Sequence, residues 1–245
     1  MTVVLKLGGS VITDKETPET VDDDALTAAV DAIADADPDR LVVVHGGGSF
    51  GHVAASERGM GRTTGSRDAA DVWAVHDAMR RLNDAVLDRL HDAGVPALPV
   101  HPLSVAARTE GNELSLPLDS TARLLGEGFV PVLHGDVVGH AGSGATIVSG
   151  DELVTRLAAG LDADRVGLCS TVPGVYDADG GVIHRITDVA SVEDALGDAD
   201  ATDVTGGMAA KVRALLALDA TAYVFGPASL SAFLAGESAG TVIDG

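Results

Sequence analysis

The fold of this chain follows from the segment Val3-Val4-Leu5-Lys6-Leu7-Gly8-Gly9-Ser10. Residues 3–7 are apolar at every position except the lysine, which predicts a strand buried on both faces, as in parallel sheets. The two glycines then break the strand and let backbone N–H groups approach a ligand closely. The segment therefore predicts a buried strand that ends in a lysine and a glycine turn.

Buried strands and amphipathic helices alternate along the rest of the chain. Apolar side chains recur every three or four positions in residues 22–34 and 68–93, which predicts a helix in each range. Further strands are predicted at residues 41–44, 130–133, 146–148, 166–169, 223–225 and 242–243, further helices at residues 152–161 and 207–218, and a turn or short hairpin at residues 136–144. This alternation predicts an α/β fold with a mainly parallel central sheet.

The composition is strongly acidic, with 37 aspartates and glutamates against 16 lysines and arginines and a net charge of −21. Nucleic acids and anionic membranes bind basic faces, so the charge argues against both as partners. At molar salt the Debye length falls to about 3 Å, and only charges in contact matter. The acidic, lysine-poor composition therefore indicates adaptation to a high-salt cytoplasm, with an ordinary acidic protein as the alternative.

The single cysteine, Cys169, rules out an internal disulfide and favours a reducing compartment, and its apolar neighbours favour a buried, unreactive thiol. The sequence enters a strand pattern at once, without the pattern of a signal peptide. No apolar stretch approaches the roughly 20 residues that span a bilayer. We therefore expect a cytoplasmic protein.

Lysine is scarce, and the positions of the three lysines are informative: they are Lys6, Lys15 and Lys211. An ammonium group is a compact point charge that reaches a phosphate without the planar fork of arginine. Lys6 lies beside Gly8-Gly9, and Lys211 follows Gly206-Gly207 at the start of a predicted helix. Glycine turns and helix N-termini both favour phosphate, so the lysines predict a phosphate site. Three incidental surface lysines are the alternative.

A third glycine loop, Gly46-Gly47-Gly48-Ser49-Phe50-Gly51-His52, follows the predicted strand at residues 41–44. Its first, third and sixth positions match the pattern G-x-G-x-x-G, so dinucleotide binding is one hypothesis. Only Asp68 and Asp71 approximate the acidic residue that this fingerprint requires, and the hypothesis leaves the lysines unexplained. The sequence contains no Walker A pattern, which excludes a P-loop kinase on pattern.

Four motifs in this order together resemble the amino acid kinase superfamily: Lys6-Leu7-Gly8-Gly9-Ser10, the triple glycine at residues 46–48, Gly150-Asp151, and Gly206-Gly207-Met208-Ala209-Ala210-Lys211. The resemblance extends from residue 3 to about residue 225. Within the superfamily, Val11-Ile12-Thr13-Asp14-Lys15 and the loop from His45 to His52 resemble the isopentenyl phosphate kinases. Fosfomycin kinases share part of this pattern.

The resemblance implies an open αβα sandwich with a mainly parallel central sheet. Residues 1–150 would form an acceptor-binding lobe and residues 151–245 an ATP-binding lobe, joined by one continuous sheet. It further implies a homodimer that uses ATP and Mg²⁺ and has a small-molecule substrate, isopentenyl phosphate. The product would be isopentenyl diphosphate, an intermediate of isoprenoid biosynthesis.

The resemblance also assigns roles to residues of the motifs. The expected catalytic residues are Lys6, Lys15, His52, Asp151 and Lys211, with the lysines around the transferring phosphoryl group and Asp151 holding lysines in place. The residues expected to bind ATP are Lys6, Gly8, Gly9, Ser10, Gly48, Asp177, Gly206 and Lys211. The residues expected to bind the acceptor are Gly47, Gly51, His52 and Gly135. No metal ligands are expected from the protein, because the ATP phosphates would hold most of the Mg²⁺ coordination.

The chemistry of phosphoryl transfer agrees with this set, since it needs alignment and charge neutralisation more than covalent catalysis. A phosphate acceptor is already an anionic nucleophile and needs no general base. His52, beside a glycine loop, is therefore expected to donate a hydrogen bond to the acceptor phosphate. The alternative is a histidine near a helix start without a ligand.

Positions in the predicted elements assign roles to three other histidines and a wall for the acceptor's tail. We expect His45 to cap its strand, His134 to line the cleft and His76 to be structural. The helix at residues 68–93, which carries Val72, Val75, His76 and Met79, is the candidate wall for an apolar tail, and plain core is the alternative for its apolar stripe.

Three other functions remain open on sequence alone. A related kinase acting on a phosphonate such as fosfomycin, on an amino-acid carboxylate or on another phosphomonoester would use the same motifs. A nucleotide or oxyanion sensor without catalytic activity would keep the fold, although retention of all three lysines and Asp151 argues against it. Dinucleotide binding is the third.

Overall fold

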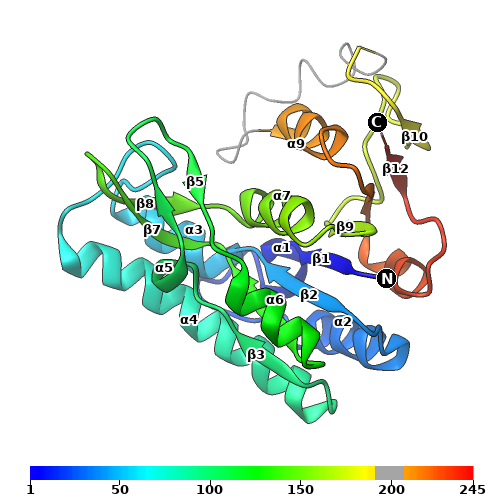
Figure 1. The fold of residues 1–245 in the computed structure, drawn as a ribbon, viewed down its shortest axis with the longest axis horizontal. Coiled ribbons are helices and arrows are strands. Elements are labelled where there is room, and N and C mark those ends of the chain that lie inside the picture. Colours follow the sequence, from blue (N-terminus) through cyan, green and yellow to red (C-terminus); the bar gives the residue numbers. More distant parts are fainter. Residues whose placement is uncertain (191–206, 245) are drawn as a thin grey trace.

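An eight-stranded sheet forms the centre of the computed structural model, which describes residues 1–190 and 207–244 (Figure 1). Its strands, in spatial order, are β10 (Arg185–Ile186), β12 (Thr241–Ile243), β11 (Thr221–Phe225), β9 (Arg165–Cys169), β1 (Val3–Leu7), β2 (Leu41–His45), β6 (Val130–His134) and β3 (Ala97–Pro99). The strands from β11 to β3 are all parallel, and β12 is antiparallel to β11. Strand β1 lies in the middle, as expected for a strand buried on both faces.

Helices cover both faces of this sheet. The apolar side chains on one face pack with α1 (Gly9–Ile12), α2 (Asp23–Ala36), α3 (Gly48–Glu57), α4 (Ala69–Asp92) and α10 (Leu230–Leu234). Those on the other face pack with α6 (Asp119–Gly126), α7 (Gly150–Gly160) and α9 (Gly207–Leu216). These layers confirm the predicted αβα sandwich with a mainly parallel sheet.

A smaller sheet stands beside the central one. It consists of β5 (Leu114–Ser115), β4 (Ala107–Arg108), β7 (Asp136–His140) and β8 (Gly144–Val148). Strands β7 and β8 form an antiparallel hairpin, which confirms the hairpin predicted after residue 136. The short helix α5 (Pro102–Val105) precedes β4, and the 3₁₀ helix η2 (Pro227–Ser229) precedes α10.

The longer predicted elements are confirmed to within a few residues. The structure adds α3, α6 and α10 and the short strands β3, β4, β5 and β10, for which no prediction was made. The added strands have only two or three residues each and α3 begins with glycines, so local patterns indicate these elements poorly. The added helix α3 matters most, because it begins inside the third glycine loop.

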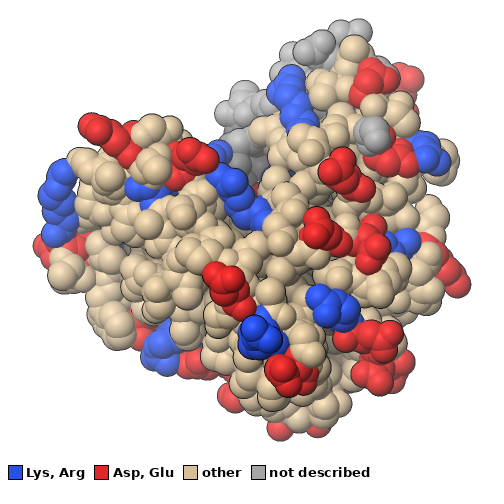
Figure 2. Space-filling view, viewed as in Figure 1, with Lys and Arg blue, Asp and Glu red and all other residues tan. Residues whose placement is uncertain are grey.

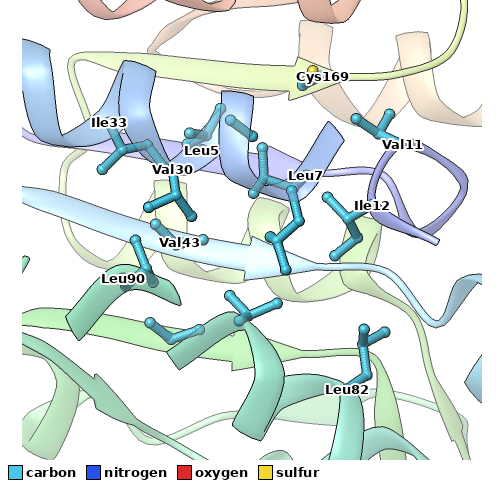
Figure 3. Close-up of a cluster of buried hydrophobic side chains, with 14 of the residues drawn as sticks. Leu5, Leu7, Val11, Ile12, Val30, Ile33, Val43, Leu82, Leu90 and Cys169 are labelled. Atoms are coloured by element: carbon cyan, nitrogen blue, oxygen red, sulfur yellow. The ribbon is translucent and has the colours of Figure 1, made fainter. Parts of the chain in front are cut away.

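The side chains of β1 alternate between the two apolar layers. Val3, Leu5 and Leu7 point to the layer that contains α2 and α4 (Figure 3). Val4 points to the opposite layer, with α7. Because successive residues of a strand face opposite sides, Lys6 shares the face of Val4 and is directed toward α7.

Acidic side chains are spread over the visible face of the molecule (Figure 2).

The thiol of Cys169 is buried with 2% of its surface exposed, and burial raises its pKa to about 12. The prediction of a buried, unreactive cysteine is therefore confirmed. Among the described residues, no helix is long and apolar enough to cross a membrane.

The first and third glycine loops are in direct backbone contact. A Cβ atom on Gly9 would lie 2.6 Å from the Cα of Gly48, and one on Gly46 would lie 2.6 Å from the Gly9 nitrogen. Gly48 also has a φ of +48°, a conformation that favours glycine. Side chains are therefore excluded at this junction, where the ends of β1 and β2 meet.

Substitution of Gly9 by alanine is expected to destabilise the protein strongly. The added methyl group would overlap backbone atoms that have no free space to move, so Gly9→Ala should lower the free energy of unfolding by more than about 3 kcal/mol. Gly126→Ala is the matched control, because a Cβ there meets no atom within 4 Å. Urea unfolding in concentrated salt measures both, and a Gly9→Ala protein as stable as Gly126→Ala would contradict this packing.

Candidate active site

Lys6 and Asp151 form an ion pair at the centre of the molecule. The Lys6 Nζ lies 2.6 Å from the Asp151 Oδ1, and their side chains are 15% and 19% exposed. Asp151 is the second residue of α7, whose start is fixed by a capping box between Ser149 and Glu152. Gly150 leaves room for the lysine, because a Cβ there would lie 3.2 Å from the Lys6 Cε.

Lys211 reaches the same carboxylate from the C-terminal half of the chain. Its Nζ lies 3.9 Å from the Asp151 Oδ2, at the far end of the carboxylate from Lys6. Helix α9, which carries Lys211, packs against α7. Two of the three lysines therefore converge on one acidic side chain.

The space-filling view is hollowed between the part with β7 and β8 and the part with α9 (Figure 2).

A threonine joins the first and third glycine loops. The Thr13 hydroxyl donates a hydrogen bond of 2.8 Å to the Gly9 carbonyl and accepts one of 3.0 Å from the Ser49 N–H. The Gly46 N–H donates to the Leu7 carbonyl at 3.0 Å. The two loops thus form one rigid turn structure beside Lys6.

The amides of the first loop differ in their availability. The Gly8 N–H donates to the Cys169 carbonyl at 2.9 Å, so it is already satisfied. Gly9 and Ser10 are the first residues of α1, and the first N–H groups of a helix have no acceptor within it. Donation from this loop to an anion therefore falls to Gly9 and Ser10 rather than Gly8.

Lys15 and His52 lie on neighbouring segments near these loops. Lys15 is exposed in the connection between α1 and α2, and the Glu19 N–H of that connection donates to the Ser49 carbonyl at 3.1 Å. His52 is exposed on the first turns of α3. No interaction between Lys15 and Asp151 occurs among the described residues, so the structure leaves this lysine apart from the other two.

The glycines predicted to bind the acceptor lie around the same junction. Gly47 and Gly51 face Met79 of α4, since a Cβ on Gly47 would come within 3.3 Å of its sulfur and one on Gly51 closer still. Gly135 follows β6, and its N–H donates to the His45 carbonyl at 3.0 Å. A Cβ on Gly135 would lie 3.6 Å from the Gly150 nitrogen, so this residue borders the start of α7.

The predicted nucleotide residues of the C-terminal half are only partly described. Asp177 lies in an exposed turn, where its carboxylate accepts hydrogen bonds from the N–H groups of Gly181, at 2.7 Å, and Asp179, at 3.0 Å. Gly206 lies outside the described residues.

The apolar stripe of α4 contributes little to a surface pocket. Val75 and Met79 are each 2% exposed and belong to the core, so the prediction that they line a pocket is wrong. Val72 does line a groove of about 390 Å³, together with Trp73, Leu103 and Ala145. The helix turns most of its apolar face to the sheet, as amphipathic helices usually do.

Four histidines and an aspartate, all of them buried except the partly exposed His101, form an array behind the glycine loops, which sequence reasoning missed. His45 and His134 occupy paired positions at the ends of β2 and β6, with ring centroids 5.5 Å apart. His101 Nδ1 lies 2.9 Å from His134 Nε2, and His76 Nδ1 lies 2.9 Å from Asp136 Oδ1. His134 is fully buried, so the prediction that it lines the cleft is wrong. The sequence feature that could have indicated this array is that a histidine, His45 or His134, lies at the end of each of two predicted strands.

Burial and the Asp136 carboxylate shift the pKa values of these histidines in opposite directions. Burial lowers the pKa of His45 to about 3 and also lowers the pKa values of His134 and His101. The hydrogen bond to Asp136 instead raises the pKa of His76. Around neutral pH His45, His134 and His101 are therefore neutral, while Asp136 favours the protonated form of His76.

Acid is expected to destabilise the protein through His45. Its pKa is lowered in the folded state, so the unfolded state binds more protons below about pH 6.5 and stability falls as the pH decreases. Between pH 7.5 and pH 5 the protonation of His45 in the unfolded state should lower the free energy of unfolding by about 2 kcal/mol. Urea unfolding at both pH values should show that His45→Asn loses about 2 kcal/mol less free energy of unfolding over this pH range than the wild type does. An equal loss in both proteins would contradict a neutral His45.

The site and the fold identify the class of protein. Residues 1–219 match the family model described as the amino acid kinase family, and the chain belongs to that family. The match confirms the resemblance drawn from the lysine and glycine motifs. A dinucleotide fingerprint is not supported, because Asp68 caps α4 and Asp71 accepts a hydrogen bond from Ser66, which lies beside the start of β8 and not at the carboxyl end of a strand of the central sheet.

Relatives within the family narrow the class further. An isopentenyl phosphate kinase of Haloferax volcanii is 68% identical over 99% of this chain and 98% of its own length. An isopentenyl phosphate kinase of Methanocaldococcus jannaschii is 32% identical over 100% of this chain and 99% of its own. A solved structure of isopentenyl phosphate kinase covers all of both chains with a TM-score of 0.84 and 28% identity. The finer resemblance is thereby confirmed, and the Haloferax relative is consistent with the high-salt interpretation.

Proposed function

We propose that this protein transfers the γ-phosphoryl group of ATP to the phosphate of isopentenyl phosphate, forming isopentenyl diphosphate for isoprenoid biosynthesis. The convergence of Lys6 and Lys211 on Asp151 is the observation that carries the proposal. The relative at 68% identity, an isopentenyl phosphate kinase, supports this choice of acceptor.

Lys6 and Lys211 neutralise the phosphoryl group as it moves. Both the donor and the acceptor are polyanions, so bringing them together requires cations at the point of transfer. Asp151 accepts from Lys6 at 2.6 Å and so fixes where the ammonium groups lie before the substrates bind. A carboxylate between two ammonium groups also keeps the empty site from carrying two unbalanced positive charges.

The acceptor phosphate lies against the third glycine loop. His52, on α3, donates a hydrogen bond to it, and the backbone near Gly47, Gly51 and Gly135 surrounds it. Lys15 joins the site from the neighbouring connection, which the Glu19 hydrogen bond ties to α3. The acceptor is itself the nucleophile, so no residue has to remove a proton.

ATP lies against the first glycine loop and the C-terminal half of the chain. The predicted contacts are Lys6, Gly8, Gly9, Ser10, Gly48, Asp177, Gly206 and Lys211. Because the Gly8 N–H already donates to the Cys169 carbonyl, we assign hydrogen bonding from the first loop to Gly9 and Ser10. The glycine junction fits phosphate, because side chains are excluded there and the first N–H groups of α1 have no acceptor within the helix. Within residues 1–190 and 207–244, no group of three or more His, Cys, Asp or Glu side chains is placed to hold a metal ion. We therefore assign most Mg²⁺ coordination to the ATP phosphates.

The organisation of the molecule follows the same proposal. Residues 1–150 form the acceptor lobe and residues 151–245 the ATP lobe, with the central sheet running through both. We further propose a homodimer that works in the cytoplasm.

Turnover with a panel of acceptors in concentrated KCl tests the function. With ATP and Mg²⁺, isopentenyl phosphate should yield ADP and a diphosphate product detected by ³¹P NMR. Faster turnover of fosfomycin or glutamate would make the protein a related kinase instead. Lys6→Met and Lys211→Met should each lower kcat by about 100-fold or more. Unchanged turnover in both variants would favour a sensor, and tight NAD binding would favour a dinucleotide site.

His52→Ala is expected to weaken acceptor binding selectively. Loss of a charge-assisted hydrogen bond should raise the KM for isopentenyl phosphate at least about tenfold, with the KM for ATP changed less than about twofold. His91→Ala is the matched control, because His91 bonds the Ala97 carbonyl at the opposite end of the sheet from the glycine loops. An equal rise in both KM values for His52→Ala would show that the lobes are misassigned.

A further inference from the structure

The buried histidine array has no role in the proposed phosphoryl transfer, yet it directly adjoins the glycine loops. His45 is 0% exposed and is the residue immediately before Gly46-Gly47-Gly48. Its Nδ1 lies 3.1 Å from the Gly46 carbonyl oxygen. A histidine that contacts the backbone of a ligand loop from below can determine how that loop is oriented.

The partner of His45 Nδ1 determines its tautomer. A carbonyl oxygen only accepts, so Nδ1 carries the hydrogen and donates to Gly46. Burial lowers the pKa of His45 to about 3, so the ring is neutral and its Nε2 is an acceptor. Nε2 lies 3.1 Å from the Asn83 amide, whose oxygen and nitrogen exchange places by a half-turn. When the Asn83 Nδ2 faces His45, it donates a hydrogen bond to the His45 Nε2. This orientation gives a partner to the Nδ2 atom, which otherwise has none in the described part of the chain.

Because the peptide group is planar, the orientation of the Gly46 carbonyl also sets the direction of the Gly47 N–H. In a trans peptide the C=O and N–H groups point in opposite directions. The Gly46 carbonyl points down to the buried His45 ring, so the N–H of Gly47 points away from the core. Within residues 1–190 and 207–244, no carbonyl or side chain accepts from this N–H. It is therefore available to an anion that lies on the loop.

The other histidines support His45 from the side. His134 Nδ1 lies 2.9 Å from the Gly135 carbonyl, so it too carries the hydrogen on Nδ1, and its Nε2 accepts from His101 Nδ1. The His134 ring stacks on His45 at an interplanar angle of 28°. Asp136 accepts from His76, Leu103 and Val137, which fixes the residue that follows Gly135. The array thus holds the ends of β2 and β6 in a single arrangement.

We propose that His45 is a positioning residue for the acceptor phosphate, holding the Gly46–Gly47 peptide so that the Gly47 N–H donates to that phosphate, with Asn83 and His134 fixing the His45 ring. This proposal rests on the proposed function, because it takes its ligand from it. Asn83 lies on α4, two helical turns beyond His76, which explains why both residues face the strand ends.

Two substitutions of the same residue separate positioning from packing. Asn places an N–H near the position of the imidazole Nδ1, and Gln places its amide near Nε2. His45→Gln should raise the KM for isopentenyl phosphate about tenfold and leave the KM for ATP within twofold. His45→Asn should restore the acceptor KM to within about threefold of the wild type. His140→Gln is the control, because this buried histidine bonds Thr146 in the β7–β8 hairpin and should change neither KM.

Two results would overturn the proposal: equal acceptor KM values for His45→Gln and His45→Asn, or a parallel rise of both KM values in His45→Gln. If either variant fails to fold, amide exchange in the wild-type protein labelled with ¹⁵N-glycine decides. Isopentenyl phosphate should slow exchange of the Gly47 amide at least tenfold, and unchanged exchange at saturating ligand would overturn the proposal. Failure of the proposed function looks different, since the wild type would then turn over no isopentenyl phosphate.

Discussion

The ion pair between Lys6 and Asp151 joins the two halves of the molecule at the point where the strands end. Lys6 is on the central strand, Asp151 begins the helix that packs beneath it, and Lys211 approaches from the last third of the chain. A carboxylate that is about four-fifths buried is expensive to leave unpaired, so the lysines and the start of α7 have to be in register. The phosphate chemistry that we propose depends on this register, because the ammonium groups are useful only when they meet at one place.

The glycine junction imposes the second constraint. The backbones of the first and third loops touch where Gly9 meets Gly48, and Thr13 bonds to both loops. This contact brings the ends of β1 and β2 together without side chains between them. Below it, His45 and His134 of the histidine array donate hydrogen bonds to the Gly46 and Gly135 carbonyl groups, just beyond the ends of β2 and β6. The site thus consists of two glycine loops that are in backbone contact with each other, lie on the histidine array and adjoin Lys6.

Much of the fold followed from the sequence, because long periodic elements such as α4 and continuous apolar runs such as β1 have strong signals. Short elements did not, since α3 begins with glycines and has weak periodicity. The pairing of Lys6 with Asp151 was expected from the motifs, whereas the histidine array was not. His45 and His134 become neighbours only through the parallel register of β2 and β6, and Asp136, in the segment predicted as a turn or short hairpin, is only 1% exposed. Contacts of this kind depend on strand order, which local patterns do not specify.

A double-mutant cycle for Lys6→Met and Asp151→Asn, measured as kcat/KM for isopentenyl phosphate in concentrated KCl, tests the central ion pair most directly. If Asp151 acts by placing the ammonium group, the double variant should lose little more activity than the more damaged single variant, with a coupling of at least about 1 kcal/mol. Independent, additive losses from the two substitutions would contradict the ion pair as the feature on which the site depends.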